Sequence, residues 1–300
     1  MTRRHLTMLL ALAALWGASF MFIKIGDREL DPLTLVGFRM ALGALTLVPI
    51  VAATVGVRRA LRELRAAAGP LVVIGLVNSA IPIYSISWAE TRIDSGLTAI
   101  LQASAPLFTA LLAVRFDRDE RVRGSRLGGL FVGFVGVALL VGAQPRGQVL
   151  AGLAVVFSAL CYAAAALYAR RVREVSPLVT ALGALTVASL ATLPPGLFRL
   201  PDHVTGWKVT ASVLTLGIAG TGLAYILYYG LLAGAGASRS ILITYLVPMF
   251  ALVYGAVLLG EPVTVAAVAG LALVLGGVAL GTGALRFRRR DRLVCSLDET

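Results

Sequence analysis

The chain has 300 residues, of which 58% are hydrophobic and only 14% charged; its mean hydropathy is +0.89 and its net charge +12. A soluble domain needs about a quarter charged residues to cover its surface, so this composition excludes a chain that is wetted on all sides. The basic residues lie between apolar runs rather than on one polar face, which argues against nucleic acid as a partner. We therefore expect an integral membrane protein whose partner is the lipid bilayer.

The first apolar stretch, from Leu6 to Ile23, follows Arg3 and Arg4 and resembles a signal peptide. It is long enough to span a bilayer, which takes roughly 20 apolar residues. No convincing small-residue cleavage site precedes the further apolar runs. We therefore expect an uncleaved first helix.

Apolar runs of this length predict an all-α integral membrane protein with ten transmembrane helices and no soluble domain. The seventh run contains Pro194-Pro195. The ten predicted spans are Leu6–Ile23, Leu33–Ala53, Pro70–Trp88, Ser95–Val114, Leu127–Ala143, Val149–Ala169, Leu178–Phe198, Val209–Ala233, Ser240–Leu259 and Val263–Gly283.

Positive charge alternates between the connections. One set of alternate connections, together with both ends of the chain, carries 20 of the 27 lysines and arginines, and the other set carries 6. Because positive loops stay in the cytoplasm, we expect both termini there and an even number of spans. The predicted location is a bacterial cytoplasmic membrane. We call the side of the bundle that faces away from the cytoplasm the predicted outer end.

An internal repeat divides the chain. Three positions in the fourth span recur in the ninth, each 142 residues later: Thr98, Gln102 and Pro106 correspond to Ser240, Thr244 and Pro248. After a one-residue slip, Glu120, Gly129 and Gly136 correspond to Glu261, Gly270 and Gly277. Five spans per half is an odd number, so the halves must have opposite orientations. Inverted repeats of this kind are typical of transporters that alternate access around a midplane site.

The repeat predicts a first half over residues 1–145, a second half over 146–285, and a basic cytoplasmic tail over 286–300. The motifs of the two halves, taken in order, resemble the EamA family of the drug/metabolite transporter superfamily. They are Leu15-Trp16-Gly17-Ala18-Ser19-Phe20, Phe38-Arg39, Ala105-Pro106-Leu107-Phe108, Val247-Pro248-Met249-Phe250 and Gly260-Glu261-Pro262. Two departures are Arg118-Asp119-Glu120 and Cys161-Tyr162. The resemblance implies ten helices around a central cavity, and export of amino acids or other metabolites.

Polar and aromatic side chains inside the predicted spans are the candidates for the cavity, because such groups are costly in hydrocarbon unless they are paired or face a cavity. Helix-to-helix hydrogen bonding is the structural alternative for each of them. The candidates are Trp16, Ser19, Asn78, Tyr84, Thr98, Gln102, Tyr162, Tyr225 and Thr244. Pro82, Pro106 and Pro248 are predicted helix breaks, since proline removes a helical hydrogen bond. We expect the segments Gln102–Pro106 and Thr244–Pro248 to face one another.

Two charged residues have predicted structural roles. Arg39 is the only charge well inside a span; it could contact an anion at the outer mouth, pin the bundle, or extend to the headgroups. Glu261 precedes Pro262 at the expected start of the last helix, where a carboxylate suits the helix dipole.

Acidic residues are absent from the middle of every predicted span. Intramembrane carboxylates are the usual proton relays and sodium ligands, so a buried-carboxylate coupling mechanism has no carrier there. Glu90 and Asp94, after the third span, are the nearest substitutes. We expect indirect coupling or facilitated diffusion.

Rival functions lack their sequence signals. No metal-ligand spacing, intramembrane aspartate pair or phosphate-binding loop is found, so we expect neither an enzyme nor a cofactor. A channel or scaffold remains an alternative, because Gly129-x-x-x-Gly133 and Gly277-x-x-x-Gly281 could pack helices within or between chains. A nucleotide-sugar carrier would need basic residues in the cavity. The sequence leaves the substrate, the transport direction and the oligomeric state open.

Overall fold

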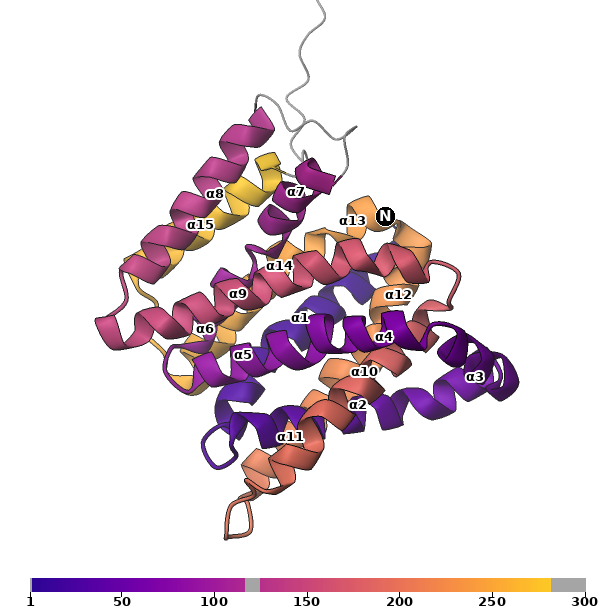
Figure 1. Ribbon diagram of the computed structural model, residues 1–300. Coiled ribbons are helices and arrows are strands. Elements are labelled where there is room, and N and C mark those ends of the chain that lie inside the picture. The colour runs from indigo at the N-terminus through magenta and orange to yellow at the C-terminus, as the bar shows by residue number, and fades with distance from the viewer. Residues whose placement is uncertain (1, 117–124, 282–300) are drawn as a thin grey trace, which may run out of the picture.

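The computed structural model describes residues 2–116 and 125–281, and within these ranges every regular element is helical (Figure 1). The expected tail over 286–300 lies outside the described residues. The first half contains α1 (Arg3–Gly26), α2 (Pro32–Thr54), α3 (Val57–Ala66), α4 (Ala68–Ile74), η1 (Gly75–Ala80), α5 (Ile81–Glu90), α6 (Ser95–Gln102), α7 (Ala105–Phe116) and α8 (Ser125–Gly142). The second contains α9 (Arg146–Tyr168), η2 (Ala169–Val172), α10 (Pro177–Leu197), α11 (Trp207–Gly217), η3 (Ile218–Leu223), α12 (Ala224–Ala235), α13 (Ala237–Ser240), α14 (Leu242–Tyr254), η4 (Gly255–Leu259) and α15 (Val265–Gly281).

Eight helical stretches of the described chain are long and apolar enough to cross a membrane. They correspond in order to the first four and the sixth to ninth predicted spans. The helices at the fifth and tenth positions, Leu127–Gly142 and Val265–Gly281, are apolar but shorter. The sequence therefore predicts the multi-spanning helical class correctly, and the count of ten spans stays a prediction. The seventh predicted span forms one helix, α10, which continues through Pro194-Pro195 in its last turn.

Two π-helical turns interrupt the third and eighth predicted spans. They are η1 and η3, each six residues long. A π-turn widens the helix locally and is frequent at functional sites. Glycines let these turns pack closely against neighbouring helices, because a larger side chain would not fit. A Cβ at Gly75 would lie 2.7 Å from the carbonyl oxygen of Ala184, and one at Gly222 would lie 2.6 Å from the Thr46 side chain.

Helices from the two halves pack against each other throughout. The pair α2 and α10 lies side by side at the bottom of Figure 1, and the pair α8 and α15 at its upper left. Helix α1 packs on α12 and α14, while α9 packs on α5, α6 and α7. Neither half could bury its apolar faces without the other.

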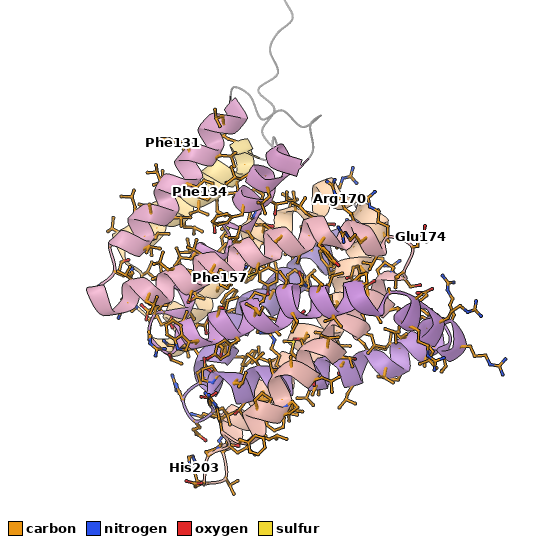
Figure 2. The ribbon with its side chains drawn as sticks, viewed as in Figure 1. Phe131, Phe134, Phe157, Arg170, Glu174 and His203 are labelled. Atoms are coloured by element: carbon orange, nitrogen blue, oxygen red, sulfur yellow. The ribbon has the colours of Figure 1, made fainter. Side chains whose placement is uncertain are left out.

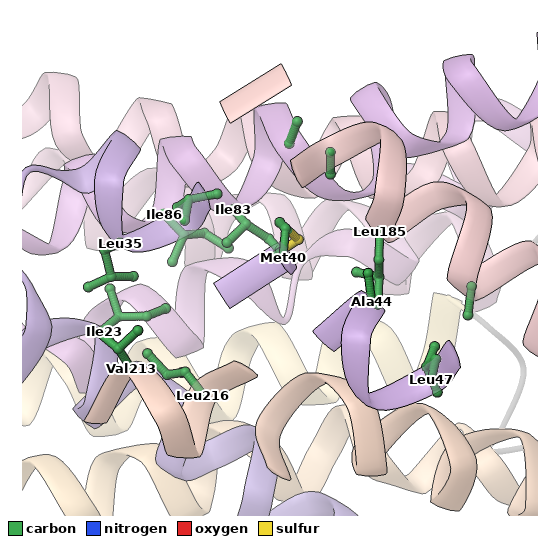
Figure 3. Packing of buried hydrophobic residues seen from close by; sticks show 14 of the residues in the cluster. Ile23, Leu35, Met40, Ala44, Leu47, Ile83, Ile86, Leu185, Val213 and Leu216 are labelled. Carbon is green, nitrogen blue, oxygen red and sulfur yellow. The ribbon is translucent and has the colours of Figure 1, made fainter. Parts of the chain in front are cut away.

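The main hydrophobic core lies between α1, α2, α5, α10 and α11 and draws on both halves (Figure 3). Its members include Ile23, Leu35, Met40, Ala44, Leu47, Ile83, Ile86, Leu185, Val213 and Leu216. A second hydrophobic cluster packs α6, α7, α8 and α9 against α15. It contains Leu101, Leu107, Leu140, Val155 and Val274.

Large apolar side chains also cover the outside of the bundle. Phe131 on α8 is 71% exposed and Phe157 on α9 is 49% exposed; both are labelled in Figure 2. Leu190 on α10 is 69% exposed. Such a surface would be unfavourable in water, and it suits contact with lipid.

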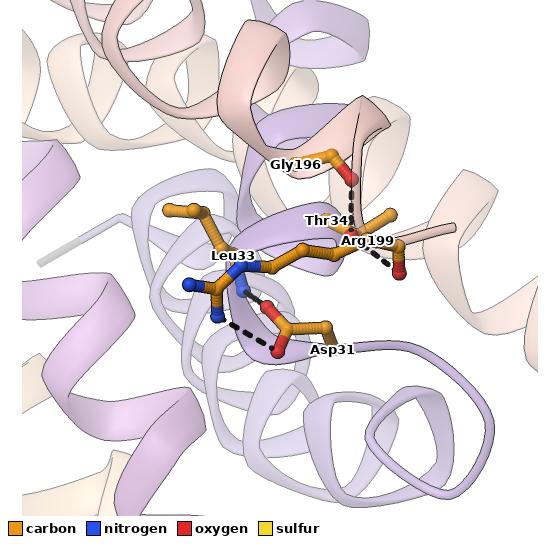
Figure 4. A network of polar contacts seen from close by, with 5 residues as sticks. All are labelled: Asp31, Leu33, Thr34, Gly196 and Arg199. Carbon is orange, nitrogen blue, oxygen red and sulfur yellow. Dashed lines mark hydrogen bonds and ion pairs between the residues drawn. The ribbon is translucent and has the colours of Figure 1, made fainter. Parts of the chain in front are cut away.

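A polar network joins the start of α2 to the end of α10 (Figure 4). Asp31 caps α2 by accepting a hydrogen bond from the backbone N–H of Leu33 at 2.9 Å, and its other oxygen lies 3.3 Å from the guanidinium of Arg199. The hydroxyl of Thr34 donates to the carbonyl of Gly196 at 2.7 Å. These contacts fix the two halves together at the predicted outer end.

Glycines form the interface between α8 and α15. A Cβ at Gly129 would lie 2.5 Å from the backbone nitrogen of Gly281, and one at Gly277 would lie 2.5 Å from that of Gly133. The two glycine motifs therefore pack on each other within one chain. Backbone atoms cannot move aside as a flexible side chain can, so the interface requires glycine.

Replacing Gly277 with alanine should destabilise the protein, because the added methyl group meets the backbone of α8. We expect a loss of roughly 1–3 kcal/mol, the usual cost of overpacking, measured as a lower midpoint of thermal unfolding in detergent.

The matched control is Gly276→Ala. No atom lies within 4 Å of a Cβ at Gly276, and alanine is the better helix former by roughly 0.5–1 kcal/mol. This variant should be neutral or stabilising; equal losses from both substitutions would contradict the packing.

Candidate functional site

A cavity of about 300 Å³ lies between α1, α12, α13 and α14. Its lining contains two predicted site residues, Trp16 and Thr244, together with Tyr228 and Ser240. The ring centroids of Trp16 and Tyr228 are 5.5 Å apart. Leu232, Ile241 and Ile243 complete the lining. Aromatic and aliphatic walls with a few hydroxyl groups suit a small, partly apolar molecule.

Gln102 and Thr244, which the sequence predicts to share one site, have different neighbours in the structure. The hydroxyl of Ser158 on α9 donates a hydrogen bond to the side-chain carbonyl of Gln102. Thr244 instead faces the cavity beside Trp16. The helices that carry these two residues, α6 and α14, pack together, and the expectation that the segments Gln102–Pro106 and Thr244–Pro248 face one another stays a prediction.

The helix breaks also differ between the halves. Pro82 follows the π-turn η1 in the first turn of α5, and Pro106 follows the break that separates α6 from α7. The break predicted at Pro248 is wrong, since α14 continues through it. The second half instead departs from regular helix at Ile241 and again at the π-turn η4.

Arg39 lies in the interior of the bundle rather than at the headgroups. Its side chain is 8% exposed, and its Nε donates to the hydroxyl of Thr221 in η3 at 3.0 Å. The charge also acts on the hydroxyls of Tyr162 and Tyr225. The extension of Arg39 to the headgroups is therefore excluded, and the side chain pins the first half to the second.

Three further candidates gather around this arginine. They are Tyr162 on α9, Tyr225 on α12 and Asn78 in η1, whose side chain lies by the hydroxyl of Tyr225. A row of tyrosine rings connects this group to the cavity. The ring centroids of Tyr225 and Tyr229 are 5.9 Å apart, and those of Tyr229 and Tyr228, which lines the cavity, are 5.3 Å apart.

The remaining candidates contribute less. Thr98 and Ser19 are buried, and their hydroxyls donate to carbonyls of their own helices, at Asp94 and Leu15. Tyr84 lies partly buried on α5 and lines neither the cavity nor the arginine site. Neither Thr98 nor Ser19 lines the cavity, and both hydroxyl groups donate within their own segment rather than to another helix.

Glu261 has a structural role, but in a different helix from the one predicted. Helix α15 begins only at Val265, and Thr264 caps it by accepting from the N–H of Ala267. The carboxylate of Glu261 accepts from the N–H groups of Ser95 and Gly96 at 3.0 and 3.2 Å, and from the hydroxyl of Ser95 at 2.8 Å. A carboxylate from the second half thus caps the N-terminus of α6 in the first, where it complements the helix dipole.

Three charged residues lie beside this cap, where α1 and α5 end. We call Lys24, Asp27 and Glu90 the carboxylate cluster. Glu90 is the last residue of α5, yet it is 0% exposed, and neither of its carboxylate oxygens has a hydrogen-bond partner. One oxygen of Asp27 accepts from Ser87 at 2.8 Å, and the other is buried without a partner. Lys24 donates to the backbone carbonyls of Glu90 and Ile93 at 2.6 and 2.8 Å.

Burial shapes the electrostatics of this end. It raises the pKa of Asp27 from 3.8 to about 8, against the lowering effects of the Ser87 hydrogen bond and the Lys24 charge. The pKa of Asp94 is raised by burial and by Glu261. Glu90, which the sequence offered as the nearest substitute for an intramembrane carboxylate, does lie at the end of its helix, but it is fully buried there. A span-end position suggested contact with water, whereas the α5–α6 turn folds inward.

Comparison with known proteins now defines the class. Residues 4–142 and 149–282 match the EamA-like transporter family. The chain belongs to this family, and it is a multi-pass membrane transporter rather than an enzyme.

Curated relatives are similar over most of their length. An "uncharacterized transporter" of Archaeoglobus fulgidus is 28% identical, over 88% of this chain and 93% of that protein. A "probable amino-acid metabolite efflux pump" of Salmonella typhimurium is 26% identical, over 98% and 99%. A "probable terminal-alkyne amino-acid exporter" of Streptantibioticus cattleyicolor is 27% identical, over 92% of each chain.

A solved crystal structure has the same overall fold. It superposes with a TM-score of 0.66 at 19% sequence identity, over 95% of this chain and 98% of that chain.

Replacing Glu261 with alanine should destabilise the protein, because the N–H groups of Ser95 and Gly96 would lose their acceptor inside the bundle. We expect a loss of roughly 1–3 kcal/mol, seen as a lower thermal midpoint in detergent.

Glu29→Ala is the comparison variant. Glu29 also accepts from a backbone N–H, that of Gly206 at 2.7 Å, but in an exposed position. Its removal should have a much smaller effect, and a loss as large as that of Glu261→Ala would show that burial is not what makes the cap important.

Proposed function

We propose that this protein is a secondary transporter that exports amino acids or related small metabolites by alternating access. In this proposal ten spans form two inverted five-helix repeats, residues 1–145 and 146–285, around a central cavity. The protein lies in a bacterial cytoplasmic membrane with both termini in the cytoplasm.

The reciprocal packing of the helices supports the inverted repeat. Helix α1 packs on α14, and α9, its counterpart in the second half, packs on α6 and α7. The self-corresponding pairs α2 with α10 and α8 with α15 also pack together. The π-turns η1 and η3 occupy equivalent places in the two halves. These are the contacts expected if a pseudo-twofold axis relates the two halves, and the two family matches, residues 4–142 and 149–282, support the same division of the chain.

One asymmetry carries the proposal of alternating access. Trp16 and Ser158 lie on α1 and α9, the first helices of the two halves, and Gln102 and Thr244 are equivalent positions 142 residues apart, so the pairs Trp16–Thr244 and Ser158–Gln102 join equivalent helices. The first pair borders a cavity, whereas the second is closed by a hydrogen bond. In an inverted repeat, equivalent contacts lie towards opposite sides of the membrane. An open Trp16–Thr244 pair and a closed Ser158–Gln102 pair therefore describe a carrier whose cavity is accessible from one side of the membrane. Closing the first pair and opening the second would give access from the other side.

The cavity lining supports a neutral or zwitterionic, partly apolar cargo. Trp16 and Tyr228 offer ring faces, and Ser240 and Thr244 offer hydroxyl groups. A nucleotide-sugar cargo would need basic side chains for its phosphates, and none lines this cavity. The relatives described as an amino-acid metabolite efflux pump and a terminal-alkyne amino-acid exporter support the same substrate class.

A channel or scaffold is the competing function. The pore of an open channel is accessible from both sides of the membrane at once, so its flux does not saturate as a carrier's does and shows no exchange of one bound molecule for another. The opposed open and closed contacts favour a carrier, which exchanges one bound molecule at a time.

Counterflow into liposomes loaded with single amino acids tests the proposal. The wild type should accumulate a labelled cargo in exchange for an unlabelled one, with saturation. Thr244→Val removes one cavity hydroxyl and should raise the half-saturating concentration roughly tenfold, the effect of losing one hydrogen bond of about 1.4 kcal/mol. Trp16→Leu should act in the same direction.

The matched control is Thr186→Val. The hydroxyl of Thr186 on α10 donates to the carbonyl of Leu182 in its own helix, and the residue does not line the cavity. Unsaturable flux in the wild type would identify a channel. Equal effects at positions 186 and 244 would remove the cavity from the mechanism.

A further inference from the structure

The carboxylate cluster is unusual in its charge. Two carboxyl groups, Asp27 and Glu90, lie near one ammonium group, that of Lys24. The ammonium group of Lys24 donates two hydrogen bonds to the backbone carbonyls of Glu90 and Ile93 rather than to the carboxylates. Both oxygens of Glu90 and one of Asp27 are consequently buried without a donor. A buried carboxylate without donors is very unfavourable in its ionised form, so this arrangement needs one more positive charge.

The missing charge fits a proton rather than a metal ion. Backbone carbonyls could help to coordinate a metal cation, but Lys24 already occupies those of Glu90 and Ile93. Within the described residues no group of three or more histidine, cysteine or acidic side chains is placed to hold a metal. A protonated carboxyl group, by contrast, needs only one small acceptor and adds no volume.

We propose that Asp27 and Glu90 form a proton-binding site at the predicted outer end of the bundle, which takes up a proton when this end closes and releases it when this end opens. For its part in coupling, this inference rests on the proposed transport function. The proton comes from water, and it returns to water when the carboxylates become hydrated.

The position of the site supports a role in opening. Glu90 ends α5, and Ile93 and Asp94 lead into α6, so Lys24 ties the turn between these helices to α1. The adjacent N-terminus of α6 is held only by side chains and packing, with Glu261 as its cap. Eleven residues separate Trp16 from Asp27, or roughly 16 Å along a helix. The cavity and the proton site are therefore distinct, and α1 connects them.

Charges on every neighbouring element set the response to pH. Asp27, Lys24, Glu261 and Arg39 act on Glu90, while Asp31 and Lys24 act on Asp27. Asp94 interacts with Glu261 and Lys24. Tyr162 on α9, which also packs against α5, acts on Arg39 instead. The acidic groups outnumber the basic ones, so a bound proton relieves repulsion.

The direction of the pH effect follows from burial. Asp27 has a pKa of about 8 in the closed arrangement, compared with 3.8 for a hydrated carboxyl group. The closed arrangement therefore has its full advantage below pH 3.8 and loses it progressively as the pH rises towards 8. One released proton changes the ratio of open to closed molecules by up to about tenfold per pH unit in this window.

Cysteine labelling in liposomes tests this directly. Leu97, in the first turn of α6, is 9% exposed, and its replacement by cysteine reports on opening. In a background of Cys161→Ala and Cys295→Ser, a membrane-impermeant maleimide should label position 97 several-fold faster at pH 8 than at pH 5.5. The rate is divided by that of Val204→Cys, since Val204 is 95% exposed, to remove the intrinsic pH dependence of thiols.

Substitutions at the site should flatten this response. In Glu90→Gln and in Asp27→Asn we expect the normalised rate to change by less than about twofold over the same range. The control Glu29→Gln, an exposed carboxylate at the same end, should respond as the wild type does. Using two variants guards against one that fails to fold, and thermal unfolding in detergent checks both.

Three results would overturn the proposal: no pH response in the wild type, an unchanged response in both variants, or a response set by Na⁺ at constant pH when K⁺ is replaced. The labelling needs no cargo, so it remains decisive even if counterflow fails. Conversely, saturable counterflow with a pH-independent labelling rate would leave the transport function intact and remove only the proton site.

Discussion

A buried polar group in an apolar bundle is costly without a partner, and several buried groups of this protein take their partner from the other half of the chain. Glu261 from the second half caps α6 in the first. Arg39 in the first half donates to Thr221 in the second, and Thr34 donates to the carbonyl of Gly196. Ser158 donates to Gln102 across the same division. These contacts and the shared core make each half depend on the other for its stability. In our proposal only a few of the polar contacts between the halves break and re-form during transport.

The overall class could be predicted from the sequence because it depends on composition and periodic charge. Apolar runs of spanning length, positive loops and the 142-residue repeat are one-dimensional signals. The family follows from motifs spread over both halves. The widened turns η1 and η3 were not predicted, because glycine-rich apolar segments are also compatible with a regular helix.

The candidate site could be predicted only in part. Trp16 and Thr244 do border the cavity, and Asn78, Tyr162 and Tyr225 gather at Arg39. A shared site for Gln102 and Thr244 stays a prediction: Gln102 accepts a hydrogen bond from Ser158, Thr244 borders the cavity, and their helices α6 and α14 pack together. Asp27 and Lys24 were overlooked although they stand at i and i+3 at the end of an apolar run. Whether a span-end charge is hydrated or buried depends on how the adjoining turn folds, and no local pattern encodes that.

The central claim is that the contacts Ser158–Gln102 and Trp16–Thr244 open and close in turn. It is tested most directly by cross-linking Gln102→Cys with Ser158→Cys in a background without other cysteines, and measuring counterflow before and after reduction. The account predicts that the disulfide stops counterflow and that a reductant restores it. Counterflow that continues at the wild-type rate with the disulfide fully formed would contradict it.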